Sequence, residues 1–114
     1  MLTLDDCLAL CELTEGEIVA IAEHEHLPMI VAAELGNYLI QGPDGALRIK
    51  RIILDDMQAA DRAGDSRRAL TLKLVLRKFV ERHPECRGRR TVPRHAVSDS
   101  VRRFLKTGPA APSI

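Results

Sequence analysis

The spacing of hydrophobic residues along the chain predicts a series of α-helices. Residues 46–63 show it most clearly, because apolar side chains recur every three or four positions with polar side chains between them. This is the pattern of a helix that lays one face on a core. The same period recurs over residues 66–82, and we find no alternating pattern typical of a strand. We therefore expect an all-α protein.

Capping and turn residues divide this pattern into separate elements. Thr14 and Glu17 form a Thr-x-x-Glu capping box at the start of one helix, and a shorter helix is predicted before it over residues 3–12. Residues 42–45, Gly-Pro-Asp-Gly, give the strongest turn signal, and residues 64–66 give a second break. Short connections favour antiparallel neighbours, so we expect a compact bundle of four to five helices.

Residues 29–40 are apolar almost all round, which is typical of a central, buried helix that supplies the core. Glu34 lies in the middle of this segment. A buried carboxylate must be paired, hydrogen-bonded or protonated, so a burial of Glu34 would indicate a functional or network role. Alternatively, Glu34 occupies a narrow exposed strip together with Asn37 and Gln41.

The C-terminal part differs in character from the rest. We expect the helical bundle domain to cover residues 1–86 and a basic extension to cover residues 87–114. One short helix is possible within it at 98–106, where apolar residues again have helical spacing. The last residues are rich in Gly, Pro and Ala, and we expect this tail to be partly disordered.

The charge of the chain is divided between its two halves. Residues 1–61 hold 12 acidic and 3 basic residues, whereas residues 62–114 hold 4 acidic and 14 basic ones. This asymmetry indicates either a basic surface for a polyanionic partner or halves that attract each other, within one molecule or between two. At 114 residues, both halves belong to a chain that fits one cooperative unit.

Several features favour a cytoplasmic protein. No apolar run approaches the roughly 18–20 residues that span a bilayer, and the N-terminus has no signal-peptide pattern, so no membrane association is expected. Three cysteines form an odd set without disulfide-framework spacing. A zinc site made of Cys7, Cys11, His83 and Cys86 is a remote alternative, since tight Cys-x-x-Cys loops are absent and lone cysteines more often point into a core.

One local motif has metal-ligand spacing. Glu23 and His26 form a Glu-x-x-His pair, which in ferritin-like di-iron bundles presents a carboxylate and an imidazole to one metal ion. Glu34 and Asp56 (or its neighbour Asp55) are possible further ligands, for iron or another divalent metal. The chain has only one such motif, so a complete site would need a dimer. The alternatives are a solvated acidic helix end and a pH-sensitive contact.

Signatures of catalysis are missing from the sequence. It contains no Gly-x-Ser-x-Gly elbow, no phosphate-binding loop and no dinucleotide-binding fingerprint. These absences do not exclude an enzyme, but they favour a non-enzymatic protein without a bound cofactor as the first expectation. The helix pair over residues 14–40 has the outline of a helix-turn-helix, but residues 1–47 contain no Lys or Arg and phosphates would repel it.

If a polyanion binds, it binds the basic segment, which has few aromatic residues for base stacking. The candidate contacts for a polyanion or an acidic partner are Arg87, Arg89, Arg90, Arg94, Arg102 and Arg103.

Three functions stay open at this point. The leading hypothesis is a non-enzymatic helical protein–protein interaction or regulatory module that self-associates, with acidic and basic segments of two copies in contact. The second is the metal-binding bundle that uses Glu23 and His26. The third is nucleic-acid or other polyanion binding by the C-terminal segment. No motif is specific enough to assign the chain to a family.

Overall fold

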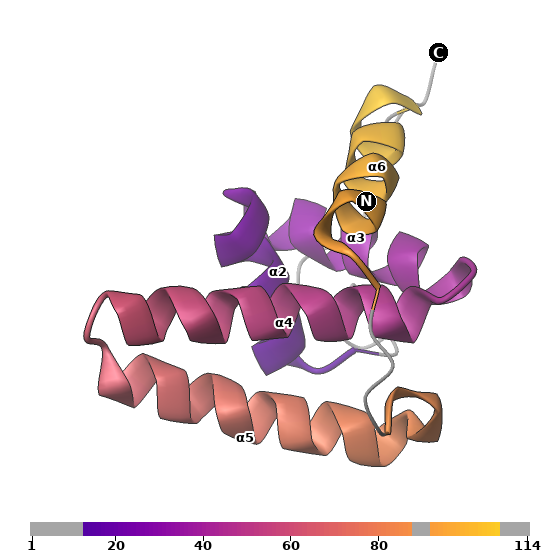
Figure 1. Ribbon diagram of the computed structural model, residues 1–114. Helices are drawn as coiled ribbons and strands as arrows, with labels where there is room; N and C mark the ends of the chain where they lie inside the picture. The colour runs from indigo at the N-terminus through magenta and orange to yellow at the C-terminus, as the bar shows by residue number, and fades with distance from the viewer. Residues whose placement is uncertain (1–12, 88–91, 108–114) are drawn as a thin grey trace.

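The computed structural model describes residues 13–87 and 92–107, and within these ranges the chain forms five α-helices, one short 3-10 helix and no strand (Figure 1). The elements are α2 (Glu15–Glu25), α3 (Met29–Gln41), α4 (Gly45–Arg62), α5 (Ser66–Arg82), η1 (Pro84–Cys86) and α6 (Arg94–Thr107). The prediction of an all-α bundle is confirmed. The helix predicted over residues 3–12 lies outside the described residues.

Helix α4 is the centre of the bundle. It runs beside α5, α3 and α6 pack on its other side, and α2 crosses behind it and contacts both α4 and α5 (Figure 1). The sequence predicted the helix over residues 29–40 in this central place, but α3 leaves Ile30 37% and Tyr38 38% exposed. A helix with polar residues can be central here because those residues have partners: Lys50 donates to the carbonyl of Cys86 at 2.8 Å, and Arg51 donates to that of Val92 at 3.1 Å.

The start of α2 combines a helix cap with a tertiary contact. The predicted capping box is present, since the Glu17 N–H donates to the Thr14 hydroxyl at 3.4 Å and the Thr14 N–H donates to Glu17 Oε1 at 2.9 Å. The Glu17 side chain is fully buried, and Arg82 at the end of α5 donates to both of its oxygens at 2.5 and 3.2 Å. This pair joins the first turn of α2 to the last turn of α5.

Helix α5 begins where the sequence predicts. The Asp65 side chain accepts a hydrogen bond from the N–H of Arg68 at 3.0 Å and caps the helix. Leu72 and Phe79 point into the core and are completely buried. The face opposite them is exposed to solvent along the length of the helix.

Helix α6 is longer than predicted and belongs to the core. It begins at Arg94, four residues before the predicted start, and packs against α3 and α4. Val97, Val101 and Phe104 are buried in the same hydrophobic cluster as the rest of the bundle, whereas Leu105 is 50% exposed. Part of the basic extension is therefore a structural helix. The expected disordered end lies outside the described residues.

Candidate functional site

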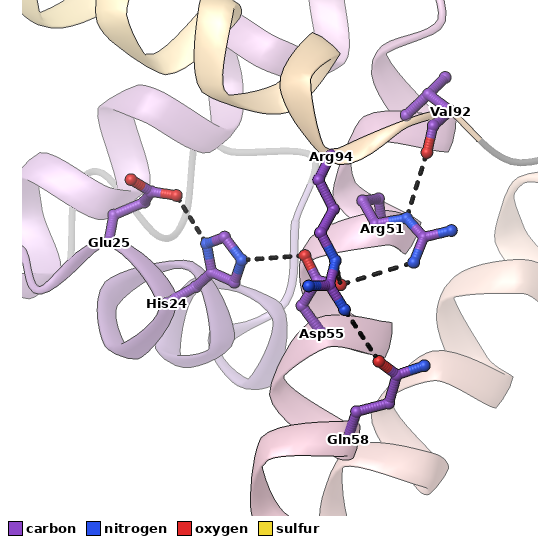
Figure 2. A network of polar contacts seen from close by, with 7 residues as sticks. All are labelled: His24, Glu25, Arg51, Asp55, Gln58, Val92 and Arg94. Carbon is purple, nitrogen blue, oxygen red and sulfur yellow. Dashed lines mark hydrogen bonds and ion pairs between the residues drawn. The ribbon is translucent and has the colours of Figure 1, made fainter.

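A network of ionisable side chains lies where α2 meets α4. The α2–α4 packing places His24, on the last turn of α2, beside Asp55 in the middle of α4 (Figure 2). Nδ1 of His24 lies 2.6 Å from Glu25 Oε2, and Nε2 lies 3.3 Å from Asp55 Oδ2. Burial by itself would lower the pKa of His24, but the hydrogen bonds and negative charges of Glu25, Asp55 and Asp56 outweigh it and raise that pKa.

Asp55 also fastens α6 to the bundle. Arg94 Nε, on the first turn of α6, lies 3.0 Å from Asp55 Oδ1, and Arg51 Nη1 lies 3.5 Å from the same oxygen. Arg94 further donates to the Gln58 side chain at 3.0 Å (Figure 2). One carboxylate thus accepts contacts from α2, α4 and α6, which makes Asp55 the hub of the network.

Asp56, the next residue of α4, has an unusual environment. Burial raises the pKa of its carboxyl to about 6, with smaller contributions in the same direction from Glu23 and Asp55, against the opposing positive charges of His24 and Arg68. Its Oδ2 atom is buried and has no hydrogen-bond partner in the described ranges. The Asp56 carboxyl is therefore easier to protonate than an ordinary aspartate, since its pKa is about 6.

The pKa of Asp56 predicts a pH dependence of stability. Because the folded pKa lies above the ordinary value of 3.8, the folded state holds an extra proton between about pH 4 and pH 6, and stability falls as pH rises through that window. The raised pKa of His24 acts in the same sense, with stability lost as pH rises through its folded pKa. We expect Asp56→Asn to stabilise the protein at pH 7.5 by about 1–2 kcal/mol, after allowance for solvent screening.

Urea unfolding of the wild type and Asp56→Asn at pH 4 and pH 7.5 measures this effect. The advantage of the variant should be small at pH 4 and should grow with pH. Asp61→Asn, an exposed change on the same helix, should keep the wild-type pH profile. An Asp56→Asn variant that loses as much stability as the wild type between the two pH values would contradict the assignment.

The same group of residues shows what became of the predicted metal ligands. A cleft of about 430 Å³ is lined by Glu23, His24, His26, Asp55, Asp56, Ala59, Arg62, Arg94 and Ser98. Glu23, His26 and Asp56 thus come together, but Glu34 is half-buried on α3 and does not line this cleft. The Glu-x-x-His motif straddles the helix end, since α2 stops at Glu25 and His26 is its left-handed cap (φ 57°).

Existing contacts of these side chains compete with metal binding. Glu23 forms an ion pair with Arg68 at 2.5 Å. Within the described ranges, no group of three or more His, Cys, Asp or Glu side chains is arranged to hold a metal ion. The metal site stays a prediction, and metal analysis of the purified protein would test it.

For the alternative zinc set, Cys7 and Cys11 lie outside the described residues. Cys86 is 1% exposed, and burial raises the pKa of its thiol, which is the environment of a structural cysteine. The neighbouring His83 ring packs on Phe79, with 4.3 Å between ring centroids.

The predicted polyanion contacts do not share one face. Arg94 and Arg103 lie nine positions apart on α6, which places them on opposite sides of the helix. Arg94 belongs to the Asp55 network, Arg102 lies 3.8 Å from Asp99, and Arg87 is exposed after η1. Arg89 and Arg90 lie outside the described residues.

The attraction expected between the acidic and basic halves occurs within one molecule. The ion pairs Glu17–Arg82, Glu23–Arg68 and Asp55–Arg94 each join a residue before position 61 to one after position 62. These contacts tie α2 to α5 and α4 to α6. Part of the charge asymmetry is therefore used in folding, and only the exposed remainder is available to partners.

A surface that the sequence analysis did not single out lies on the outer face of α5. Leu70 is 61% exposed and Leu74, one turn later, is 49% exposed. They belong to a shallow groove of about 600 Å³ made by α5 residues alone, which are Leu70, Lys73, Leu74, Leu76, Arg77, Val80 and Glu81. The signal in the sequence was the repeated leucines of residues 70–76, which place apolar side chains on both faces of one helix.

Comparisons with models of protein families, with curated proteins and with solved structures find no match to this chain. No described helix is both long enough and apolar enough to cross a membrane.

Proposed function

We propose that the protein is a helical protein–protein interaction module whose docking surface is the outer face of α5. Its occupant is an amphipathic helix with acidic side chains, supplied by another protein. The observation that carries the proposal is the pair of exposed leucines, Leu70 and Leu74, on a helix whose opposite face is packed on α4. Solvent-facing positions on a surface helix are ordinarily polar.

The leucines alone are too small a driving force. Complete burial of an exposed leucine is worth about 1.5–3 kcal/mol, so covering two that are already half-covered contributes about 2 kcal/mol. Association costs at least about 4 kcal/mol in lost translational and rotational freedom. The charged residues in the same groove must therefore contribute, and their sign selects the partner.

The charge of α5 favours an acidic helix over a second copy of the chain. Ser66–Arg82 contains six basic residues and a single acidic one, Glu81. Two copies that met through this face would bring like charges together. Lys73 and Arg77 instead lie one turn apart among the apolar residues of the groove, where each can pair with a carboxylate of an acidic helix. Self-association, as first hypothesised, would have to use another face of the molecule.

The length of the groove defines the expected partner segment. From Leu70 to Glu81 the helix rises by about 16 Å, close to three turns. A partner helix of about 12 residues covers that length. It needs apolar residues at spacings of three and four, flanked by Asp or Glu, as in other helix-in-groove complexes.

Fluorescence anisotropy with a designed probe tests the proposal. The probe is a labelled 14-residue peptide with a leucine stripe flanked by glutamates, and a second peptide has lysines in their place. The wild type should bind the acidic peptide, and Leu70→Ser/Leu74→Ser should bind it at least tenfold more weakly. Leu105→Ser, which changes an equally exposed leucine on α6, is the matched control and should bind like the wild type.

A charge reversal tests the choice of partner. The variant Lys73→Glu/Arg77→Glu should no longer bind the acidic peptide and should bind the lysine peptide instead. Binding that is insensitive to the leucine variant would refute the docking surface. A homodimer in sedimentation that Leu74→Ser abolishes, or a preference for anionic vesicles or duplex DNA over the peptide, would refute the proposed partner.

A further inference from the structure

A third pocket, smaller than the cleft at Asp56 and the groove on α5, lies between the end of α3, the first turn of α4 and α6. Its volume is about 270 Å³. The residues that line it are Tyr38, Leu39, Gln41, Gly42, Pro43, Arg48, Ser100 and Arg103. This set includes two guanidinium groups, from different helices, and no carboxylate. The pocket is therefore a concentrated positive charge beside an apolar wall.

Arg48 is the unusual member of this set. It is half-buried, and its Nε atom is buried without a hydrogen-bond partner. The side chains of the nearby Lys50 and Arg51 contact carbonyl or carboxylate oxygens. By contrast, the Arg48 side chain forms no hydrogen bond or ion pair with any residue in the ranges 13–87 and 92–107. A guanidinium does not lose its proton in a protein, so Arg48 brings a permanent positive charge to the pocket together with one buried donor that lacks a partner.

We infer that this pocket binds a small oxyanion, a carboxylate or a phosphate group, between Arg48 and Arg103. Guanidinium groups match the planar geometry of such anions and donate two hydrogen bonds at once. Tyr38 and Gln41 also line the pocket, and their side chains carry a hydroxyl and an amide that can donate hydrogen bonds.

The opposing contributions are smaller than the charge of the Arg48 guanidinium. The C-terminal end of α3 carries a partial negative charge of about half a unit, which disfavours an anion, but the full positive charge of Arg48 alone exceeds it. The Ser100 hydroxyl donates to the Ala96 carbonyl at 3.0 Å and so offers the ligand an acceptor instead of a donor.

The shape of the pocket limits the ligand. A volume of about 270 Å³ is below the range of drug-sized sites, which begins near 300 Å³. Tyr38 is held in place by the Phe104 ring, with 5.3 Å between ring centroids, and Pro43 and Leu39 complete an apolar side. The site fits an oxyanion with a short organic group.

Calorimetry on the full chain tests the inference, with total ionic strength held constant by NaCl. Three probes separate the ligand chemistries: inorganic phosphate, glycerol phosphate and acetate. The wild type should bind at least one of them, and Arg48→Met and Arg103→Met should each weaken that binding tenfold or more. Arg102→Met is the matched control, because Arg102 is the exposed neighbour of Arg103 on α6 and does not line the pocket.

A second measurement separates binding from folding. Without added anion, Arg48→Met should unfold at the same temperature as the wild type or higher, because it removes an unpaired buried donor. With the bound anion, only the wild type and Arg102→Met should gain thermal stability. No binding of any probe to the wild type, or equal binding by Arg48→Met and the wild type, would overturn the inference.

Discussion

Replacing Gly45 with alanine is expected to destabilise the protein by about 3 kcal/mol or more. Gly45 is the first residue of α4, and a Cβ atom there would lie 2.0 Å from the carbonyl oxygen of Leu39 and within 3 Å of two backbone atoms of Ile40. These atoms belong to the end of α3 and cannot rotate away as a side chain can. Alanine would gain up to about 1 kcal/mol in helix propensity, which offsets only part of the strain.

Two other glycines provide the comparison. At Gly36 a Cβ would meet only the ends of the Leu13 and Ile21 side chains, at 2.5 and 2.9 Å, which can turn aside. Gly42→Ala would make ordinary contacts. Thermal unfolding should rank the variants Gly45→Ala, Gly36→Ala and Gly42→Ala from least to most stable, with a fall in Tm of about 10–20 °C for the first. A Tm for Gly45→Ala as high as that for Gly42→Ala would contradict this close contact between α3 and α4.

Replacing Arg82 with methionine is expected to destabilise the protein by about 2–3 kcal/mol. Methionine keeps much of the apolar stem but leaves the fully buried carboxylate of Glu17 without its cation. The Thr14 N–H would still donate to that carboxylate, which limits the loss. The Arg82 side chain is 37% exposed, so solvent already weakens the pair, and we place the cost below that of a completely buried one.

A second substitution, Glu17→Met, tests whether Arg82 stabilises the protein as part of a buried ion pair or only by packing. Adding Glu17→Met to Arg82→Met removes the unpaired carboxylate, so the double variant should be more stable than Arg82→Met alone despite the lost helix cap. Urea unfolding of both variants and of Arg77→Met, an exposed arginine on the same helix, provides the measurement. A double variant less stable than Arg82→Met would contradict the account.

Local signals in the sequence predicted the elements but not their arrangement. The Thr14–Glu17 capping box and the breaks at residues 42–45 and 64–66 each lie within a few positions and were sufficient to place helix ends. The choice of central helix was wrong, because average apolarity favours residues 29–40. The central α4 instead satisfies its polar residues with partners distant in sequence, such as the Cys86 carbonyl 36 residues away.

The candidate sites were hidden for the same reason. His24 meets Asp55 across 31 residues, and Glu17 meets Arg82 across 65, so neither pairing leaves a local pattern. The sequence predicted that Glu17 caps α2, and the structure confirms it. Its second contact, with Arg82, forms only when the bundle is folded. The leucines on the outer face of α5 were visible in the sequence, but the inner stripe of the same helix already accounted for the helical period.

The outer face of α5 has an evolutionary consequence. The groove around Leu70, Lys73, Leu74 and Arg77 is made by α5 residues alone. Substitutions at such exposed positions ordinarily change stability by no more than about 0.5 kcal/mol, whereas changes in α4 affect every helix it touches. If this groove docks a partner as we propose, its specificity can therefore change one residue at a time while the fold stays unaltered.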